Sequence, residues 1–153
     1  RQGRGQEAYD QLARSLESIS HPAVPLRLLG ILASANGHPH EALEFLERAM
    51  SMDPRPTTPM GDPWSVMARS ALQIGQPVKA LTSLLGGDKQ TRSADEFELL
   101  LGDASRELKL PLSAERFYRI AARRNPASFE AQSRLAALLL TQKGEAAAIA
   151  YLE

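Results

Sequence analysis

Five alanines recur along this chain at nearly constant intervals, and each lies in a similar local sequence. The intervals are 34, 38, 34 and 34 residues, and the alanines are Ala8, Ala42, Ala80, Ala114 and Ala148. A fixed period of this length indicates one supersecondary unit repeated along the chain. Because such a unit cannot bury its apolar face alone, neighbouring units are expected to stack in a row. The additional residues of the longer interval are expected in segment 55–60, whose prolines are typical of a loop.

Each period is predicted to contain two helices. In the second period, Leu26, Leu29 and Ala33 recur at helical spacing. The pair Asn36-Gly37 suits the left-handed conformation that commonly ends a helix, and Pro39 suits the first turn of the next helix. Only 5% of the residues are aromatic, while alanine and leucine are abundant, and this composition favours helix over sheet.

Glycines mark the positions where paired helices are expected to approach closely. Gly30 and Gly102 lie in first helices, and we predict that they face the second helices of the same periods. In the third period, Gly86-Gly87 is expected to end the second helix early. Ser93 and Glu96 have the spacing of a capping box at the start of the fourth period.

When the periods are aligned on their alanines, they resemble the tetratricopeptide repeat, whose pattern is W-x2-L-G-x2-Y, then A-x3-F, then P. The third period has Trp64 in the tryptophan position, and the fourth has Leu101-Gly102 followed by Ala114 and Tyr118. The resemblance implies an all-α fold, a right-handed α-solenoid of antiparallel helix pairs. Its expected organisation is one array with a second helix of a partial repeat at 1–20, repeats at 22–54, 61–93 and 94–126, and a truncated repeat at 127–153.

The resemblance also implies a concave groove, lined by first helices, that binds a peptide or a helix of a partner protein. First-helix residues not used for packing are candidates to line it, with Ser133, Ala137 and Thr141 farther along the chain. The candidates are Arg27, Ile31, Ser65, Arg69, Gln73, Leu99, Asp103, Arg106 and Glu107. Their mixed charge suggests a partner with acidic or polar groups at one end and basic groups at the other. The alternative is that these are ordinary solvated charges without a specific role.

The residue inventory favours no catalytic, cofactor or metal site. Cysteine is absent, which excludes disulfides and thiol catalysis. His38 and His40 flank a proline in a predicted turn without a carboxylate cluster, so a turn role is favoured over metal binding. The segment 86–89 lacks the spacing of a phosphate-binding loop. We therefore expect that the chain is not an enzyme.

Charge and hydropathy limit the partners further. Acidic and basic residues balance at 18 each, without the basic stripe of a nucleic-acid-binding protein. No apolar run approaches the roughly 18 residues of a membrane span. Arg119, Arg123 and Arg124 form the one basic cluster that we single out. It has two interpretations: a site for phosphate or an acidic partner, or cations that favour a helix C-terminus.

The sequence therefore predicts a protein-interaction scaffold. Arginine exceeds lysine and alanine is abundant, which suggests a GC-rich bacterial source. Such arrays resemble periplasmic scaffold parts of exopolysaccharide-secretion and envelope-assembly proteins. Because the chain begins at Arg1 and stops at Glu153 within a helical pattern, we expect a fragment of a longer protein. Two alternatives stay open: a regulatory or substrate-presenting domain fused to a catalytic region, and self-association through the exposed ends of the array.

Overall fold

The computed structural model describes residues 2–15, 19–20, 22–54, 62–87 and 94–152. Across these ranges every regular element is a helix, and the chain divides into two compact units, Arg1–Arg92 and Ser93–Glu153. The predicted all-α fold class is confirmed.

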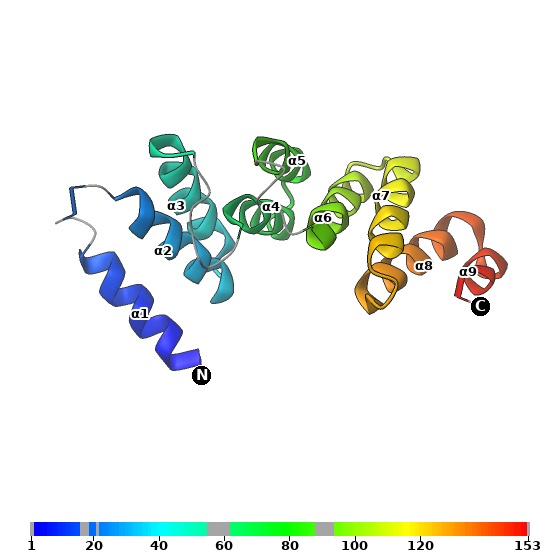
Figure 1. Cartoon of the computed structure of the whole chain (residues 1–153), viewed down its shortest axis with the longest axis horizontal. Coiled ribbons are helices and arrows are strands. Elements are labelled where there is room, and N and C mark those ends of the chain that lie inside the picture. The colour runs from blue at the N-terminus through cyan, green and yellow to red at the C-terminus, as the bar shows by residue number, and fades with distance from the viewer. Residues whose placement is uncertain (1, 16–18, 21, 55–61, 88–93, 153) are drawn as a thin grey trace. The chain divides into compact units, whose positions relative to one another are not determined.

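The first unit contains five helices within its described residues (Figure 1). They are α1 (Gln2–Ser15), α2 (Ala23–Ala35), α3 (Pro39–Met52), α4 (Pro63–Gln73) and α5 (Pro77–Gly86). Helix α2 packs on α3, α4 packs on α5, and α3 also packs on α4. The first helices of the two pairs touch as well, since the Ser70 hydroxyl lies 3.2 Å from the Ser34 hydroxyl. This is the stacking of neighbouring helix pairs that the period predicts.

The second unit contains two further pairs within its described residues. They are α6 (Ala94–Glu107) with α7 (Pro111–Arg124), and α8 (Phe129–Lys143) with α9 (Glu145–Leu152). Helix α7 packs on both α6 and α8. The core of this unit includes Leu99, Tyr118, Leu135 and Leu139, all buried.

The repeated alanines occupy equivalent places in the second helices. Ala42, Ala80 and Ala114 are fully buried, and Ala148 is 7% exposed. Ala8 is exposed on α1. In α3, α5, α7 and α9 the period therefore coincides with a buried alanine of the second helix.

The turn between paired helices is the same structure three times. In the first copy, Gly37 N–H donates to the carbonyl of Ser34 and His38 N–H donates to the carbonyl of Ala33. These two bonds define the Schellman motif, in which one residue takes the left-handed conformation. That residue has φ of +81° at Gly37, +71° at Gly75 and +59° at Lys109. A proline follows each turn at the start of the next helix, at Pro39, Pro77 and Pro111.

Three predictions about glycines are confirmed. A Cβ on Gly30 would lie 2.5 Å from Cγ of Leu46 in α3, and a Cβ on Gly102 would lie 2.3 Å from Cε1 of Tyr118 in α7. Helix α5 ends at Gly86, and both Gly86 and Gly87 lie against the indole ring of Trp64. At each of these glycines, a large side chain of the paired helix occupies the space that a Cβ would need.

Some sequence predictions lie outside the described residues. These are the loop at 55–60 and the capping role of Ser93. The helix pairs α2–α3, α4–α5, α6–α7 and α8–α9 fall inside the residue ranges assigned to the repeats. The division into repeats of one array stays a prediction.

Candidate functional site

The structure separates the nine predicted groove residues by exposure. Four are exposed, namely Arg69, Gln73, Arg106 and Glu107. Ile31 and Asp103 are half-buried. The remaining three, Arg27, Ser65 and Leu99, are buried, so their predicted place on an open surface needs correction.

Arg27 links α2 to the end of α3. Its side chain is fully buried, and its Nη2 donates to the backbone carbonyl of Asp53 at 2.6 Å and lies 2.9 Å from the Asp53 carboxylate. The sequence places Arg27 off the apolar stripe of its helix, which predicts that it lines the open groove. The long side chain instead reaches inward to a carboxylate that follows the next helix, which spacing within one helix does not reveal.

Ser65 and Leu99 are buried for different reasons. The Ser65 hydroxyl donates to the Asp62 carboxylate at 2.8 Å, and the same carboxylate accepts the Trp64 N–H at 3.0 Å. Asp62 is therefore the N-cap of α4, and Ser65 belongs to that cap. Leu99 belongs to the apolar core of the second unit.

Asp103 is held by two residues of its own unit. Its carboxylate accepts the Tyr118 hydroxyl at 2.6 Å and also accepts from the Arg134 guanidinium, which bonds Glu130 as well. Burial raises the pKa of the Tyr118 hydroxyl and lowers the pKa of the Arg134 guanidinium. The charge of Asp103 is thus largely matched inside the unit rather than free for a partner.

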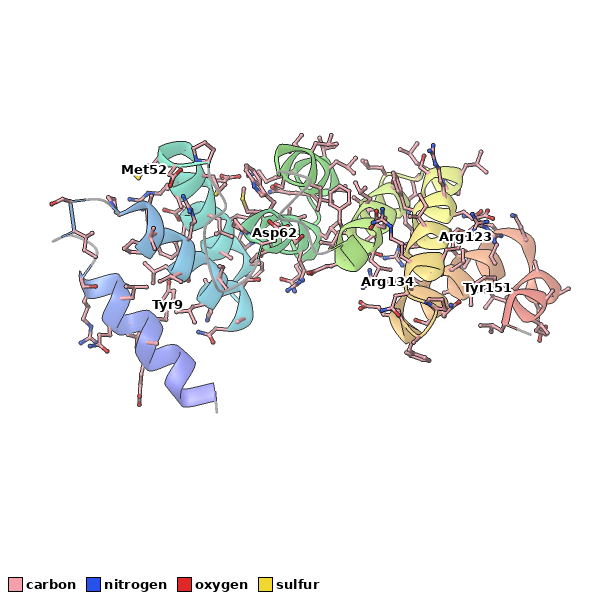
Figure 2. All side chains as sticks on the ribbon, viewed as in Figure 1. Tyr9, Met52, Asp62, Arg123, Arg134 and Tyr151 are labelled. Carbon is pink, nitrogen blue, oxygen red and sulfur yellow. The ribbon has the colours of Figure 1, made fainter. Side chains whose placement is uncertain are left out.

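A hollow lies between the first helices α6 and α8, and we name it the α6–α8 hollow. Its volume is about 410 Å³. Its lining residues are Arg106, Ser133, Arg134, Ala137, Leu138 and Thr141. The structure thus brings Arg106 of the predicted set together with Ser133, Ala137 and Thr141. Arg134, labelled in Figure 2, was not predicted, although its spacing of four residues from Glu130 signals an ion pair along α8.

The α6–α8 hollow combines two guanidinium groups with an apolar floor. Arg106 is exposed and lies 3.1 Å from Glu107, which is also exposed, while Leu138 is buried beneath the surface. Ion pairs between exposed side chains contribute only about 0–1 kcal/mol, so Arg106 can exchange Glu107 for another carboxylate or carbonyl at little cost. The hollow therefore suits a polar group beside a small apolar side chain.

Among the described residues, no three His, Asp or Glu side chains gather as metal ligands. Across the same residues, no helix combines the length and apolarity needed to cross a bilayer.

Comparisons with known proteins decide the fold. No family model and no curated protein matches the chain. Solved structures do match. A crystal structure of MamA is 16% identical with a TM-score of 0.81, over 97% of this chain and 85% of that one. A structure of MamA from Desulfovibrio magneticus RS-1, which runs from residue 41 to the end of that protein, is 17% identical. Its TM-score is 0.84, over 98% of this chain and 82% of that one.

A third match is pilF of Pseudomonas aeruginosa, which is 20% identical with a TM-score of 0.76, over 97% of this chain and 66% of that one. MamA and pilF are both tetratricopeptide-repeat proteins. The chain has the tetratricopeptide-repeat fold. This confirms the resemblance inferred from the alanine spacing. At these identities the tetratricopeptide-repeat likeness concerns the fold, and the binding surface has to be argued from this chain's own residues.

Proposed function

We propose that the chain is a protein-interaction scaffold that binds a peptide or a helix of a partner across its first helices. The observation that carries this proposal is the α6–α8 hollow, where residues of two successive first helices form one concave surface. An open surface of this kind suits a segment that lies across it.

The hollow also limits the chemistry of the segment. Arg106 offers donors to a carboxylate or a backbone carbonyl, and Ala137 is exposed and small, so it leaves room for an apolar side chain above Leu138. Asp103 and Glu130 already bond Arg134, which limits the net positive charge of the hollow. We therefore propose a partner segment with one acidic or polar group next to an aliphatic side chain.

The test is to fill the hollow without disturbing the fold. Ala137→Trp places a large ring in the α6–α8 hollow at an exposed position. Ala150→Trp makes the same change at an exposed position of α9 and is the matched control. The wild-type chain and both variants are used as baits in affinity capture, with quantitative mass spectrometry of the retained proteins.

We expect a specific partner to be retained by the wild type and by Ala150→Trp, and to be depleted with Ala137→Trp. Equal retention by all three baits would mean that partners use another surface. Circular dichroism spectra that match between the two variants would exclude misfolding as the cause of depletion.

We further propose a bacterial envelope setting, with exopolysaccharide secretion or envelope assembly as the process. The support is the arginine-rich composition and two similar structures from named bacteria, Desulfovibrio magneticus and Pseudomonas aeruginosa. Subcellular fractionation of the source cells, with an antibody against this chain, tests the compartment. Recovery in the cytoplasmic fraction would contradict a periplasmic setting.

A further inference from the structure

The exposed face of α7 presents a row of basic residues that begins with a leucine. Leu112, Arg116, Arg119 and Arg123 follow one another at intervals of three and four residues, so they lie on one side of the helix. At 1.5 Å per residue the row is about 17 Å long. The opposite side of α7 is buried, through Ala114, Tyr118, Ala121 and Ala122.

The cations of this row outnumber the available carboxylates. Glu115 pairs with both Lys143 and Arg119, at 3.0 and 2.9 Å. The hydrogen bond from Lys143 is the main cause that lowers the pKa of Glu115, so this carboxylate is ionised at neutral pH. Arg116 and Arg123 are exposed, and neither has an ion-pair partner among the described residues. Among the described residues that line this surface, the three arginines of the row and Lys143 of α8 thus face one carboxylate, Glu115.

The structure also divides the arginine cluster that stands out in the sequence. Arg124 pairs with Glu98 of α6 at 2.7 Å, and Glu98 is buried, so Arg124 ties α7 to α6. Arg119 and Arg123 belong instead to the exposed row. The guanidinium of Arg119 lies 5.9 Å from the ring centre of Tyr151, a cation–π contact that helps to fix its position.

The row lines a hollow of about 490 Å³, which we name the α7 hollow. Its lining residues are Leu112, Glu115, Arg116, Arg119, Ile120, Arg123 and Lys143. Leu112, at one end, has 79% of its surface exposed, and Ile120 is half-buried. Figure 2 labels Arg123 of α7 and Tyr151 of α9. The α7 hollow shares no residue with the α6–α8 hollow.

We propose that the α7 hollow is a second docking surface, which binds an acidic segment of a partner protein. Carboxylates of the segment pair with Arg116 and Arg123, whose guanidinium groups can each hold a carboxylate through two parallel hydrogen bonds. An apolar side chain of the segment covers Leu112. This surface is separate from the α6–α8 hollow on which the proposed function rests.

The observations favour an acidic protein segment over a nucleic acid or a membrane. The chain as a whole has balanced charge, 18 basic against 18 acidic residues, which provides no extended field for a polyanion. The basic row is about three helical turns long and holds one strongly exposed leucine rather than an apolar band. A short acidic segment with one apolar anchor matches both the length and the chemistry.

The experiment measures binding of a fluorescein-labelled peptide of four Glu-Glu-Leu triplets by fluorescence anisotropy. A peptide of four Lys-Lys-Leu triplets is the control probe. The test variant combines Arg116→Glu with Arg123→Glu. Its matched control combines Arg14→Glu with Arg48→Glu, which makes the same charge change at exposed positions of α1 and α3. All proteins are compared by circular dichroism and thermal melting.

We expect the acidic probe to bind the wild type and to bind the Arg14/Arg48 control within about twofold of it. The Arg116/Arg123 variant should bind about tenfold or more weakly, and raising the salt from about 50 mM to 300 mM should weaken wild-type binding. Leu112→Ser should weaken binding without any change of charge. Ala137→Trp should leave binding unchanged, which separates this surface from the one in the proposed function.

Three results would overturn the proposal. One is equal binding of the acidic and basic probes to the wild type. Another is the same loss of affinity in both double variants, which would mean attraction by net charge alone. The third is binding to vesicles that contain phosphatidylglycerol, lost in the Arg116/Arg123 variant, together with no binding of the peptide; the row would then be a membrane contact.

Discussion

At the scale of single residues, Gly102 shows how closely two helices of a pair approach. A Cβ at this position would lie 2.3 Å from Cε1 of Tyr118, closer than two carbon atoms can approach without a shift. Gly102→Ala should therefore displace the Tyr118 ring and cost about 1–3 kcal/mol of stability, despite the better helix propensity of alanine. Urea denaturation followed by circular dichroism measures the change.

A double-mutant cycle identifies the contact responsible. Tyr118→Leu removes the ring that the new methyl group meets, so Gly102→Ala should cost much less in that background. Ser133→Ala, at an exposed position of α8, is the control for a neutral helical substitution. If Gly102→Ala cost the same in the Tyr118→Leu background as in the wild type, the strain would lie elsewhere.

Arg27 leads to an asymmetric prediction. Its Nε and Nη1 have no hydrogen-bond partner among the described residues, so the buried guanidinium is only partly satisfied by Asp53. Arg27→Met removes the partly unsatisfied buried charge, so it should change the unfolding free energy by no more than about 1 kcal/mol. Asp53→Ala leaves the cation buried without its carboxylate and should destabilise by about 3 kcal/mol.

Thermal and urea unfolding of the two single variants and of the double variant measure this asymmetry. In the double variant no buried charge remains, so most of the loss caused by Asp53→Ala should be recovered. If Arg27→Met lowered the free energy of unfolding more than Asp53→Ala did, the ion pair would make a net stabilising contribution to the fold.

Residue by residue, the sequence predicted packing better than polar contacts. Small residues at fixed intervals identified Gly30 and Gly102 because close helix contact admits only small side chains. The pairing of Arg27 with Asp53, and that of Arg134 with Asp103, joins different helices through long side chains. Spacing within one helix contains no information on such partners, and this explains why Arg27 was misplaced and Arg134 was missed.

At the scale of elements, the three Schellman turns differ in the residue that takes the left-handed conformation. Gly37 and Gly75 adopt it without steric cost, whereas Lys109 has a Cβ and a φ of +59°. Left-handed backbone costs an L-residue roughly 1–2 kcal/mol, and a glycine at this position would remove that cost. Glycine also increases the conformational entropy of the unfolded chain, which offsets part of the gain in stability. Lys109→Gly should therefore stabilise the protein by about 0.5–1 kcal/mol in urea denaturation.

Gly75→Ala is the opposite change at the equivalent position and serves as the comparison. A Cβ there meets nothing within 4 Å, so its cost, expected near 1 kcal/mol, is purely conformational. If Lys109→Gly were destabilising, the Lys109 side chain would contribute an interaction that exceeds the backbone strain.

The link between α7 and the end of α8 should depend on pH through Glu115. Lys143 is the main cause that holds the pKa of this carboxyl below its ordinary value of 4.5. The stabilisation is thus fully present above about pH 4.5 and is lost as the pH falls through the lower pKa of the folded state. The melting temperature of Glu115→Gln should be slightly below that of the wild type near neutral pH and should converge with it in acid.

Differential scanning calorimetry between pH 2 and pH 7 tests this convergence. Glu145→Gln, at an exposed position of α9, is the control for the loss of one carboxylate. A difference between wild type and Glu115→Gln that persists undiminished at the lowest pH would assign it to packing rather than to charge.

At the scale of the whole molecule, the period in the sequence was enough to predict stacked helix pairs, because repeat proteins are held together by contacts between neighbours. The division into two compact units was not predicted. The alanine spacing continues at 34 residues from Ala80 to Ala114, across the boundary between the units. A sequence period predicts the contacts within each helix pair. It does not predict how strongly successive pairs pack on one another.

Two units with separate cores should respond separately to core damage. Leu135→Ala removes a fully buried side chain from the second unit and should cost about 2–5 kcal/mol. In hydrogen exchange measured by mass spectrometry, amides of α7 and α8 should lose protection, while those of α2 and α3 keep it. Leu46→Ala, equally buried in α3, should give the reverse pattern. A uniform loss of protection from either variant would show that the chain opens as one cooperative block instead of as two units.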